Sequence, residues 1–118
     1  MLYKALQRGE AIGVLPDQAP GVGEGEWADF FGRPAYTMTL VTRLQQTSGA
    51  AVIMAFAERL AQGRGYHLHL QTVTGPLDPS AMNRAVEAIV RTCPAQYLWG
   101  YNRYKVPAGA EPPPAAIR

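Results

Sequence analysis

The spacing of apolar residues predicts two helices in the first half of the chain. Residues 2–8 have the pattern of the last turns of a helix, and Gly9 follows where a C-terminal cap belongs. A second helix is predicted over residues 38–48, because apolar side chains recur there at helical spacing. Thr37 is expected to cap the start of this helix and Gly49 its end.

The clearest helical signal begins at Asp78. An aspartate followed by Pro79 is typical of a helix cap and first turn, and Pro94 is expected to end the helix. A further helical segment is predicted over residues 95–105. The apolar face of the helix that begins at Asp78 consists of residues at spacings of three and four: Met82, Ala85, Val86, Ile89, Val90 and Cys93.

Three segments have the pattern of strands. Residues 11–15, AIGVL, form a short apolar run, and residues 50–58, AAVIMAFAE, form a continuous one that predicts a strand buried on both faces. Residues 65–73, GYHLHLQTV, alternate between apolar and polar. The turn AQGRG, residues 61–65, predicts that the last two strands pair antiparallel. With the helices, these strands indicate an α/β fold with a small mixed sheet flanked by helices.

Composition limits the classes of protein that the chain can represent. It has 118 residues, 47% of them hydrophobic and 17% charged, which is enough for one domain or a piece of one. The net charge of +2 is too small to demand a polyanionic partner. The sequence has no apolar run long enough to span a membrane and no signal-peptide core. The single cysteine, Cys93, excludes an intrachain disulfide.

The glycine-rich stretch GVGEGE, residues 21–26, invites a nucleotide-binding interpretation that its sequence does not support. Its third glycine comes one residue too early for the GxGxxG pattern, and no lysine or threonine directly follows. Glu24 and Glu26 would also repel a bound phosphate. We therefore interpret the stretch as a solvated surface loop that lets the chain bend.

Asp17 and Gln18 follow the predicted strand at residues 11–15. Open α/β sheets place their ligand crevices at the carboxyl ends of strands, so this position favours a functional role. Pro16 and Asp17 also have ordinary turn chemistry, and the sequence weights the two interpretations about equally.

Two histidines lie two residues apart on a predicted strand. His67 and His69 therefore share a face, but a zinc site needs three or four ligands, and the chain has no third histidine or suitably placed cysteine. We expect no metal here, and histidines that are exposed or partly buried. Cys93 lies on an apolar helix face and is interpreted as a small core residue.

Aromatic and basic residues alternate near the C-terminus. Such a pattern suits single-stranded nucleic acid, a membrane interface, or internal packing with an arginine stacked on a ring. The low net charge argues against a polynucleotide, while packing and membrane contact both stay open. The residues are Tyr97, Trp99, Tyr101, Arg103, Tyr104 and Lys105.

Four blocks together resemble a known family. They are RGEAIGVLPDQAPG, FFGRPAYT, FAERLAQGRGYHLHL and PAQYLWGYNRYKVPAG, and they occur in family order over residues 8–109. They are similar to the C-terminal half of the lipid A biosynthesis acyltransferases, the lauroyl and myristoyl transferases that acylate the lipopolysaccharide anchor. Any one block is weak, but four in order are specific.

The resemblance implies a fold and a reaction. The family is similar to the glycerol-phosphate acyltransferase group, with an α/β fold, an N-terminal membrane helix and a His-x4-Asp/Glu dyad. In that chemistry the histidine acts as general base on an acceptor hydroxyl, which attacks an acyl carrier protein thioester. The implied partners are acyl carrier protein, a lipid A precursor and the cytoplasmic face of the bacterial inner membrane. No cofactor and no nucleic acid partner are implied.

The dyad is absent from this sequence. Thr72 follows five residues after His67, and Thr74 follows five residues after His69, so neither histidine has the carboxylate of the motif. We therefore expect a segment that begins after the catalytic half and is inactive alone. Residues 1–106 would be the C-terminal part of the acyltransferase domain, and residues 107–118 a flexible tail rich in proline and alanine.

The resemblance also implies site residues. Asp17 and Gln18 match the block that would line the acceptor side of the site, and Phe31 and Arg33 match a second block that would contact substrate. The competing interpretation is a non-enzymatic module that binds anionic membrane or nucleic acid through residues 96–105. Three residues at the end of the match are expected to contact lipid or membrane: Trp99, Arg103 and Lys105.

Overall fold

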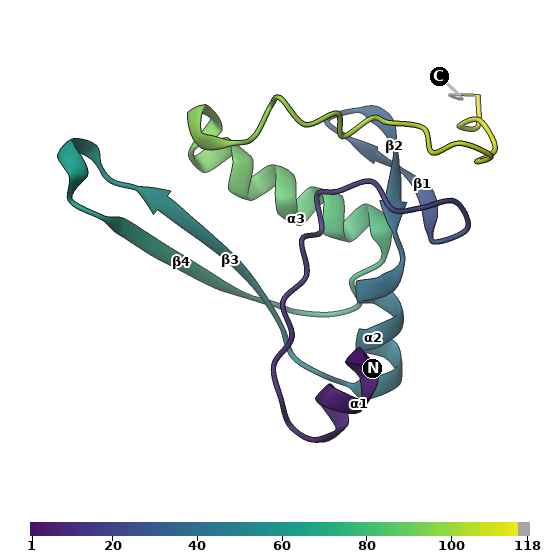
Figure 1. Cartoon of the computed structure of the whole chain (residues 1–118), viewed down its shortest axis with the longest axis horizontal. Helices are drawn as coiled ribbons and strands as arrows, with labels where there is room; N and C mark the ends of the chain where they lie inside the picture. Colours follow the sequence, from purple (N-terminus) through teal and green to yellow (C-terminus); the bar gives the residue numbers. More distant parts are fainter. Residues whose placement is uncertain (116–118) are drawn as a thin grey trace.

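The computed structural model describes residues 1–115. Within that range the elements in chain order are α1 (Leu2–Gln7), β1 (Gly25–Phe30), β2 (Arg33–Met38), α2 (Leu40–Ser48), β3 (Val52–Arg59), β4 (Tyr66–Val73) and α3 (Pro79–Thr92). The strands form two antiparallel hairpins, with α3 packed beside the first and with α1 and α2 near the base of the second (Figure 1). The expected α/β class is confirmed, and the strands form two separate two-stranded sheets where we had expected one mixed sheet.

The first hairpin, β1–β2, was not predicted as such. Its strands pair from Gly25 opposite Met38 to Phe30 opposite Arg33, with Phe31 and Gly32 forming the two-residue turn. Both turn residues have positive φ, 50° for Phe31 and 74° for Gly32, as type I′ hairpin turns require. Phe31 is an unusual residue at such a position, because left-handed backbone strains a bulky side chain.

Helix α3 confirms the strongest sequence signal. The Asp78 carboxylate accepts a hydrogen bond from the Ala81 N–H at 2.7 Å, and Pro79 occupies the first turn as predicted. The apolar face of α3 packs against the β1–β2 hairpin, where a core forms. The buried residues of that core are Phe30, Ala35, Val86 and Val90.

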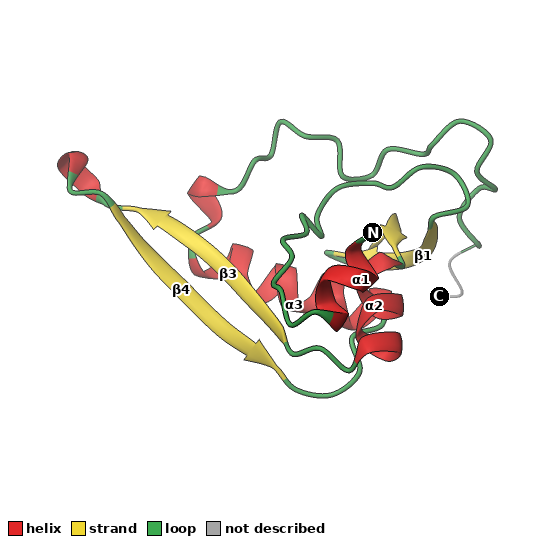
Figure 2. Cartoon of the chain, turned by 60° about the horizontal axis from the view of Figure 1, so that its bottom comes forward, coloured by secondary structure: helices red, strands yellow, loops and turns green. Residues whose placement is uncertain are grey.

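The second hairpin, β3–β4, confirms the predicted antiparallel pairing but not the predicted burial. Its strands pair from Val52 opposite Val73 to Arg59 opposite Tyr66. The turn of the hairpin projects beyond the rest of the described chain (Figure 2), whereas the end of β3 is held by the Gln96 side chain, which is hydrogen-bonded to the Arg59 backbone at 2.8 and 2.9 Å. Met54 on its inner face packs against the core, whereas β4 is exposed along nearly its whole length. The prediction that residues 50–58 are buried on both faces is wrong, because only one face of β3 meets other described residues.

The helices at the base of the second hairpin, α1 and α2, agree with the predictions except at one cap. Gly9 and Gly49 follow α1 and α2 with φ of 78° and 66°, as expected for C-terminal glycines. Thr37 lies in β2, and Thr39 precedes α2 instead, so the predicted cap is wrong. The chain first completes a hairpin with Thr37 and only then turns into the helix.

The predicted strand at residues 11–15 is also wrong. This segment is irregular and forms part of the wall of an apolar cleft of about 490 Å³ between α1, α2 and the start of β3. Strand formation needs a neighbouring strand to satisfy the backbone, and the described chain offers none beside this segment. The apolar composition therefore indicated that this segment contacts other apolar residues, but it did not predict the backbone conformation.

The chain after α3 runs as turns rather than as the predicted helix over residues 95–105. A single turn of 3-10 helix, Pro94–Gln96, ends at once, and the following residues form successive turns. Beyond them, Pro107 is buried and the Trp27 indole N–H donates a hydrogen bond to the Glu111 carbonyl at 3.1 Å. The flexibility assigned to residues 107–118 stays a prediction, and the last three of these residues lie outside the described part.

Candidate functional site

A buried arginine lies in a network of hydrogen bonds between β2, α3 and the C-terminal turns. Arg103 is 3% exposed, and its two terminal nitrogens donate to the Tyr36 carbonyl at 2.9 Å, to Thr37 Oγ1 at 2.9 Å and to Asn83 Oδ1 at 3.1 Å. Its side chain also lies over the Phe30 ring, 5.3 Å from the centroid. A guanidinium group suits this position because its rigid fork reaches several acceptors at once.

Asn83 extends the same network from helix α3 to the first hairpin. Its Nδ2 group donates to Thr37 Oγ1 at 2.9 Å and to the Asp29 carbonyl at 3.2 Å. The Thr37 hydroxyl in turn donates to the Ala35 carbonyl at 2.9 Å. The network therefore joins β1, β2, α3 and the C-terminal turns through side chains that are almost fully buried.

Burial of Arg103 corrects the expectation that this residue contacts a membrane surface. Its guanidinium is already committed to internal acceptors, and removing it from them would leave buried polar groups without partners. The packing interpretation of this arginine, with its side chain on an aromatic ring, is the one that the structure supports. Trp99 and Lys105, in contrast, are exposed.

Asp17 lies near this arginine although it does not form an ion pair with it among the described residues. Burial lowers the pKa of Arg103, and the charge of Asp17 is one of the influences that oppose this shift. Burial also raises the pKa of Tyr97, and the Asp17 carboxylate raises it further. Asp17 therefore lies close enough for its charge to influence Arg103 and Tyr97, without a hydrogen bond or ion pair to either of these described residues.

The loop that carries Asp17 is held against the C-terminal turns. The Ala19 backbone N–H donates to the Tyr101 hydroxyl at 2.8 Å, which fixes the loop beside the aromatic segment. Asp17 is half-buried, whereas Gln18 is exposed. The structure therefore brings Asp17 close to residues that are remote in sequence, and leaves Gln18 facing solvent.

The tip of the first hairpin gathers aromatic rings and cations. The Phe31 backbone N–H donates to Glu87 Oε1 at 2.6 Å, which anchors the strained turn to α3. The Arg91 guanidinium lies 4.9 Å from the centroid of the Phe31 ring, and that of Arg33 lies 4.2 Å from the Tyr104 centroid. Cations at these distances from ring faces are attracted by the ring quadrupole.

A second, smaller cleft lies beside this tip. It has a volume of about 300 Å³. Trp99 is 59% exposed at its edge, where its ring lies 4.8 Å from that of Tyr97 in an edge-on arrangement. We call the surface formed by Phe31, Arg33, Arg91, Trp99 and Tyr104 the aromatic–arginine surface. The residues that line the cleft are Phe30, Tyr97, Trp99, Gly100, Tyr101, Asn102, Arg103 and Tyr104.

The glycine-rich stretch has a packing role at its end. A Cβ atom on Gly25 would come within 2.7 Å of both the Pro20 and the Tyr36 side chains, so only glycine fits there. The Gly23 N–H donates to the Tyr36 hydroxyl at 3.1 Å instead of facing an open anion site. The predicted bend is therefore found over residues 21–24, whereas Gly25 and Glu26 already belong to β1, so the prediction of a surface loop over residues 21–26 is wrong at its end.

Comparison with known proteins identifies the family. A sequence model described as bacterial lipid A biosynthesis acyltransferase matches residues 1–106. The lipid A biosynthesis lauroyltransferase of Escherichia coli K12 is 30% identical over 112 residues, and the palmitoleoyltransferase of the same strain is 34% identical over 108 residues. A lipid A biosynthesis acyltransferase of Haemophilus influenzae is 28% identical over 99 residues. The chain belongs to the lipid A biosynthesis acyltransferase family, and the resemblance inferred from the four blocks is confirmed.

The matches cover most of this chain but a minor part of its relatives. The aligned regions span 88% of the chain and 37% of the lauroyltransferase, and 86% of the chain and 35% of the palmitoleoyltransferase. The chain thus spans about a third of the length of these curated relatives. In residues 1–115, no helix has the length and apolar character needed to cross a bilayer.

Proposed function

We propose that the chain is part of an enzyme that transfers an acyl chain from an acyl carrier protein thioester to a hydroxyl group of a lipid A precursor. The observation that carries this proposal is the family match over residues 1–106. In the reaction the acceptor oxygen attacks the thioester carbonyl, a C–O bond forms, the C–S bond breaks, and the thiol of the carrier leaves. A general base takes the proton of the acceptor hydroxyl.

We assign that base to a part of the enzyme outside this sequence. The only histidines here, His67 and His69, are followed by threonine where the dyad needs a carboxylate. The remaining role of this chain is to shape the site and bind substrate. Asp17 and the aromatic–arginine surface are the groups that we assign to that role, since they combine charge, ring faces and a neighbouring cleft.

Exposed apolar surface supports a larger protein around this chain. The outer face of the second hairpin carries Ile53, Leu68 and Leu70, which are 57%, 58% and 64% exposed. Soluble proteins seldom leave such a contiguous apolar face uncovered. The match spans only 37% of the lauroyltransferase, so this relative contains a large region that the chain does not match. We propose that the corresponding region of the complete enzyme packs on this face.

Substituting Asp17 tests its proposed role in substrate binding. In the longer enzyme, Asp17→Asn and Asp17→Ala are each expected to reduce acyl transfer at least tenfold while the melting temperature changes by a few degrees at most. The carboxylate is half-buried, and its charge influences Arg103 and Tyr97. A lost turn cap, in contrast, costs only about 0.5–2 kcal/mol of stability and leaves the chemistry unchanged. Acyl transfer is measured as product formed per minute.

Asp29→Asn is the matched control for Asp17→Asn, because Asp29 is an exposed carboxylate on β1. Its activity is expected to equal that of the unaltered enzyme. Activity of Asp17→Asn near the unaltered level would show that Asp17 serves the turn alone.

The exposed residues at the C-terminal turns support contact with a membrane surface. Leu98, Trp99 and Val106 are 71%, 59% and 51% exposed, and Lys105 is exposed among them. Apolar and aromatic side chains beside a cation suit the headgroup region of a bilayer, and each nearby Lys or Arg adds about 1 kcal/mol on an anionic surface. We therefore propose that residues 98–106 contact the inner membrane. Arg103 is not one of the contacting residues, because it is buried.

Vesicle sedimentation tests the proposed membrane contact. The chain is expected to bind vesicles that contain acidic phospholipid, and Trp99→Ala combined with Lys105→Ala is expected to lower binding severalfold. Arg64→Ala, which removes an exposed cation at the tip of the second hairpin, is the control and is expected to bind normally. Binding that is indifferent to the double substitution would contradict the proposal. Saturable quenching of tryptophan fluorescence by single-stranded DNA would instead favour the nucleic acid module.

A further inference from the structure

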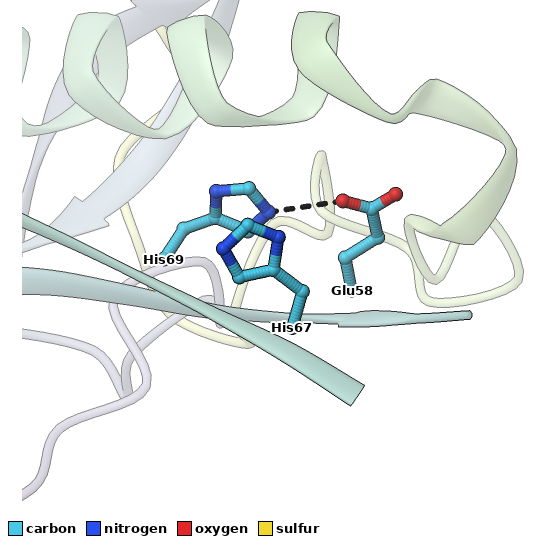
Figure 3. Close-up of side chains that lie close together, drawn as sticks. All are labelled: Glu58, His67 and His69. Carbon is cyan, nitrogen blue, oxygen red and sulfur yellow. Dashed lines mark hydrogen bonds and ion pairs between the residues drawn. The ribbon is translucent and has the colours of Figure 1, made fainter. Parts of the chain in front are cut away.

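The second hairpin places two histidines and a glutamate together on one face. Glu58 on β3 lies directly opposite His67 on β4, and opposite residues of an antiparallel pair point to the same side of the sheet. His69 is two residues further along β4 and shares that side. The three side chains therefore converge, although they come from two strands (Figure 3).

The distances suit a common ligand. His69 Nε2 lies 2.9 Å from Glu58 Oε1, and the imidazole rings of His67 and His69 stack with centroids 4.1 Å apart. One ligand atom from each of the three residues can be chosen so that all lie within 4.8 Å of one another. Ligand atoms around tetrahedral zinc are roughly 3.3 Å apart, given metal–ligand distances of about 2.0–2.2 Å, so small rotations of these side chains would complete the geometry.

We propose that Glu58, His67 and His69 form a zinc site, with a water molecule as the fourth ligand. Two imidazole nitrogens and one carboxylate oxygen, with water as the fourth ligand, are a common ligand set for Zn²⁺. The site is accessible, because the side chains of His69 and Glu58 are 45% and 35% exposed. The argument from sequence against a metal counted histidine and cysteine alone and missed the glutamate that the hairpin pairing supplies.

Zinc at this position would act as a clip between the strands. β3 and β4 pair only with each other in the described chain, and a two-stranded hairpin has little stability of its own. Its other anchors are on β3, where Met54 packs against the core and the Arg59 backbone is hydrogen-bonded to the Gln96 side chain. One ligand from β3 and two from β4 would tie the strands together near the projecting end. Phe56, whose ring stacks on that of His69 at 5.5 Å, would hold one imidazole in place.

Zinc titration of the 118-residue chain without a histidine tag tests the proposal directly. We expect one equivalent of Zn²⁺ to bind, as measured by calorimetry, and one equivalent of Co²⁺ to give visible absorption of a tetrahedral complex. The imidazole signals of both histidines in nuclear magnetic resonance spectra are expected to shift together. This readout is clean because the chain contains no other histidine.

Single substitutions and matched controls decide the outcome. His67→Ala, His69→Ala and Glu58→Gln are each expected to weaken Zn²⁺ binding at least tenfold. The melting temperature of the metal-free chain is expected to change by a few degrees at most, since the side chains of His69 and Glu58 are partly exposed, at 45% and 35%. Glu26→Gln, an exposed carboxylate on β1, and Cys93→Ser, the only thiol, are expected to bind normally. Absent binding, binding indifferent to the three substitutions, or binding lost with Cys93→Ser would each overturn the site.

Discussion

Replacing Arg103 with methionine is expected to lower the free energy of unfolding by about 3 kcal/mol or more. The substitution leaves the Tyr36 carbonyl and Asn83 Oδ1 buried without the guanidinium that donates to them, and each unsatisfied buried group costs about 1–3 kcal/mol. Arg103→Lys is also expected to be destabilising. A single ammonium group on a flexible stem cannot reproduce the fork that reaches three acceptors.

Chemical denaturation of the purified variants measures this effect. Lys105→Met is the matched control: it removes a cation two residues away that is exposed, and surface substitutions of this kind are usually within about 0.5 kcal/mol of neutral. Asn83→Leu, which removes the partner on α3, is expected to destabilise by a similar amount to Arg103→Met. A loss below about 1 kcal/mol for Arg103→Met would contradict the view that this network organises the core.

The elements that the sequence predicted correctly are those set by local chemistry. Helix α3 has a cap at Asp78, a proline in its first turn and a regular apolar face, and none of these depends on distant residues. The second hairpin was predicted from alternation along β4 and from the short turn at residues 61–65. Glycine caps at Gly9 and Gly49 are local signals too, since a left-handed backbone favours glycine wherever it occurs.

The first hairpin was not predicted, because its turn lacks the residues that normally indicate a two-residue hairpin turn. Type I′ turns favour Asn-Gly or Asp-Gly, whereas this one has Phe31 in left-handed conformation. Its stability depends on contacts from elsewhere: Glu87 accepts from the Phe31 N–H, and Arg91 lies over the Phe31 ring. Neither contact is visible before α3 is placed beside the hairpin.

Burial of Arg103 was equally hidden in the sequence. An arginine between tyrosines can lie at a surface or in a core. Arg103 is buried because it finds hydrogen-bond acceptors in β2, which lie 66 and 67 residues away in the sequence. Asn83 was missed because it lies among the apolar positions of α3 without a motif of its own. An asparagine within the core-facing part of a predicted helix is the signal that could have indicated a buried polar partner.

The site role of Asp17 stays a prediction, and the reason first given for it is wrong. Its placement after a strand was the reason to favour function, and that strand does not exist. The residue nevertheless lies near Arg103 and Tyr97, because the Ala19 N–H bonds to the Tyr101 hydroxyl and draws the loop inward. The proposal for this aspartate therefore rests on the resemblance of its block to the family and not on a sheet edge.

The isolated chain is expected to have no acyltransferase activity at all. It contains no histidine with a carboxylate at the dyad spacing, so the general base of the proposed mechanism is not among its residues. Aromatic, cationic and apolar surfaces would still allow it to bind lipid. Binding without turnover is therefore the expected behaviour of residues 1–118.

The central claim is tested most directly by acyl transfer with the isolated chain and the longer enzyme side by side. Each is incubated with acyl carrier protein thioester and lipid A precursor, and mass spectrometry detects the precursor heavier by one acyl chain. We predict product from the longer enzyme, none above blank from residues 1–118, and none after the dyad histidine of the longer enzyme is replaced by alanine. Absence of product from the longer enzyme, or turnover by the isolated chain that survives His67→Ala with His69→Ala, would contradict the account.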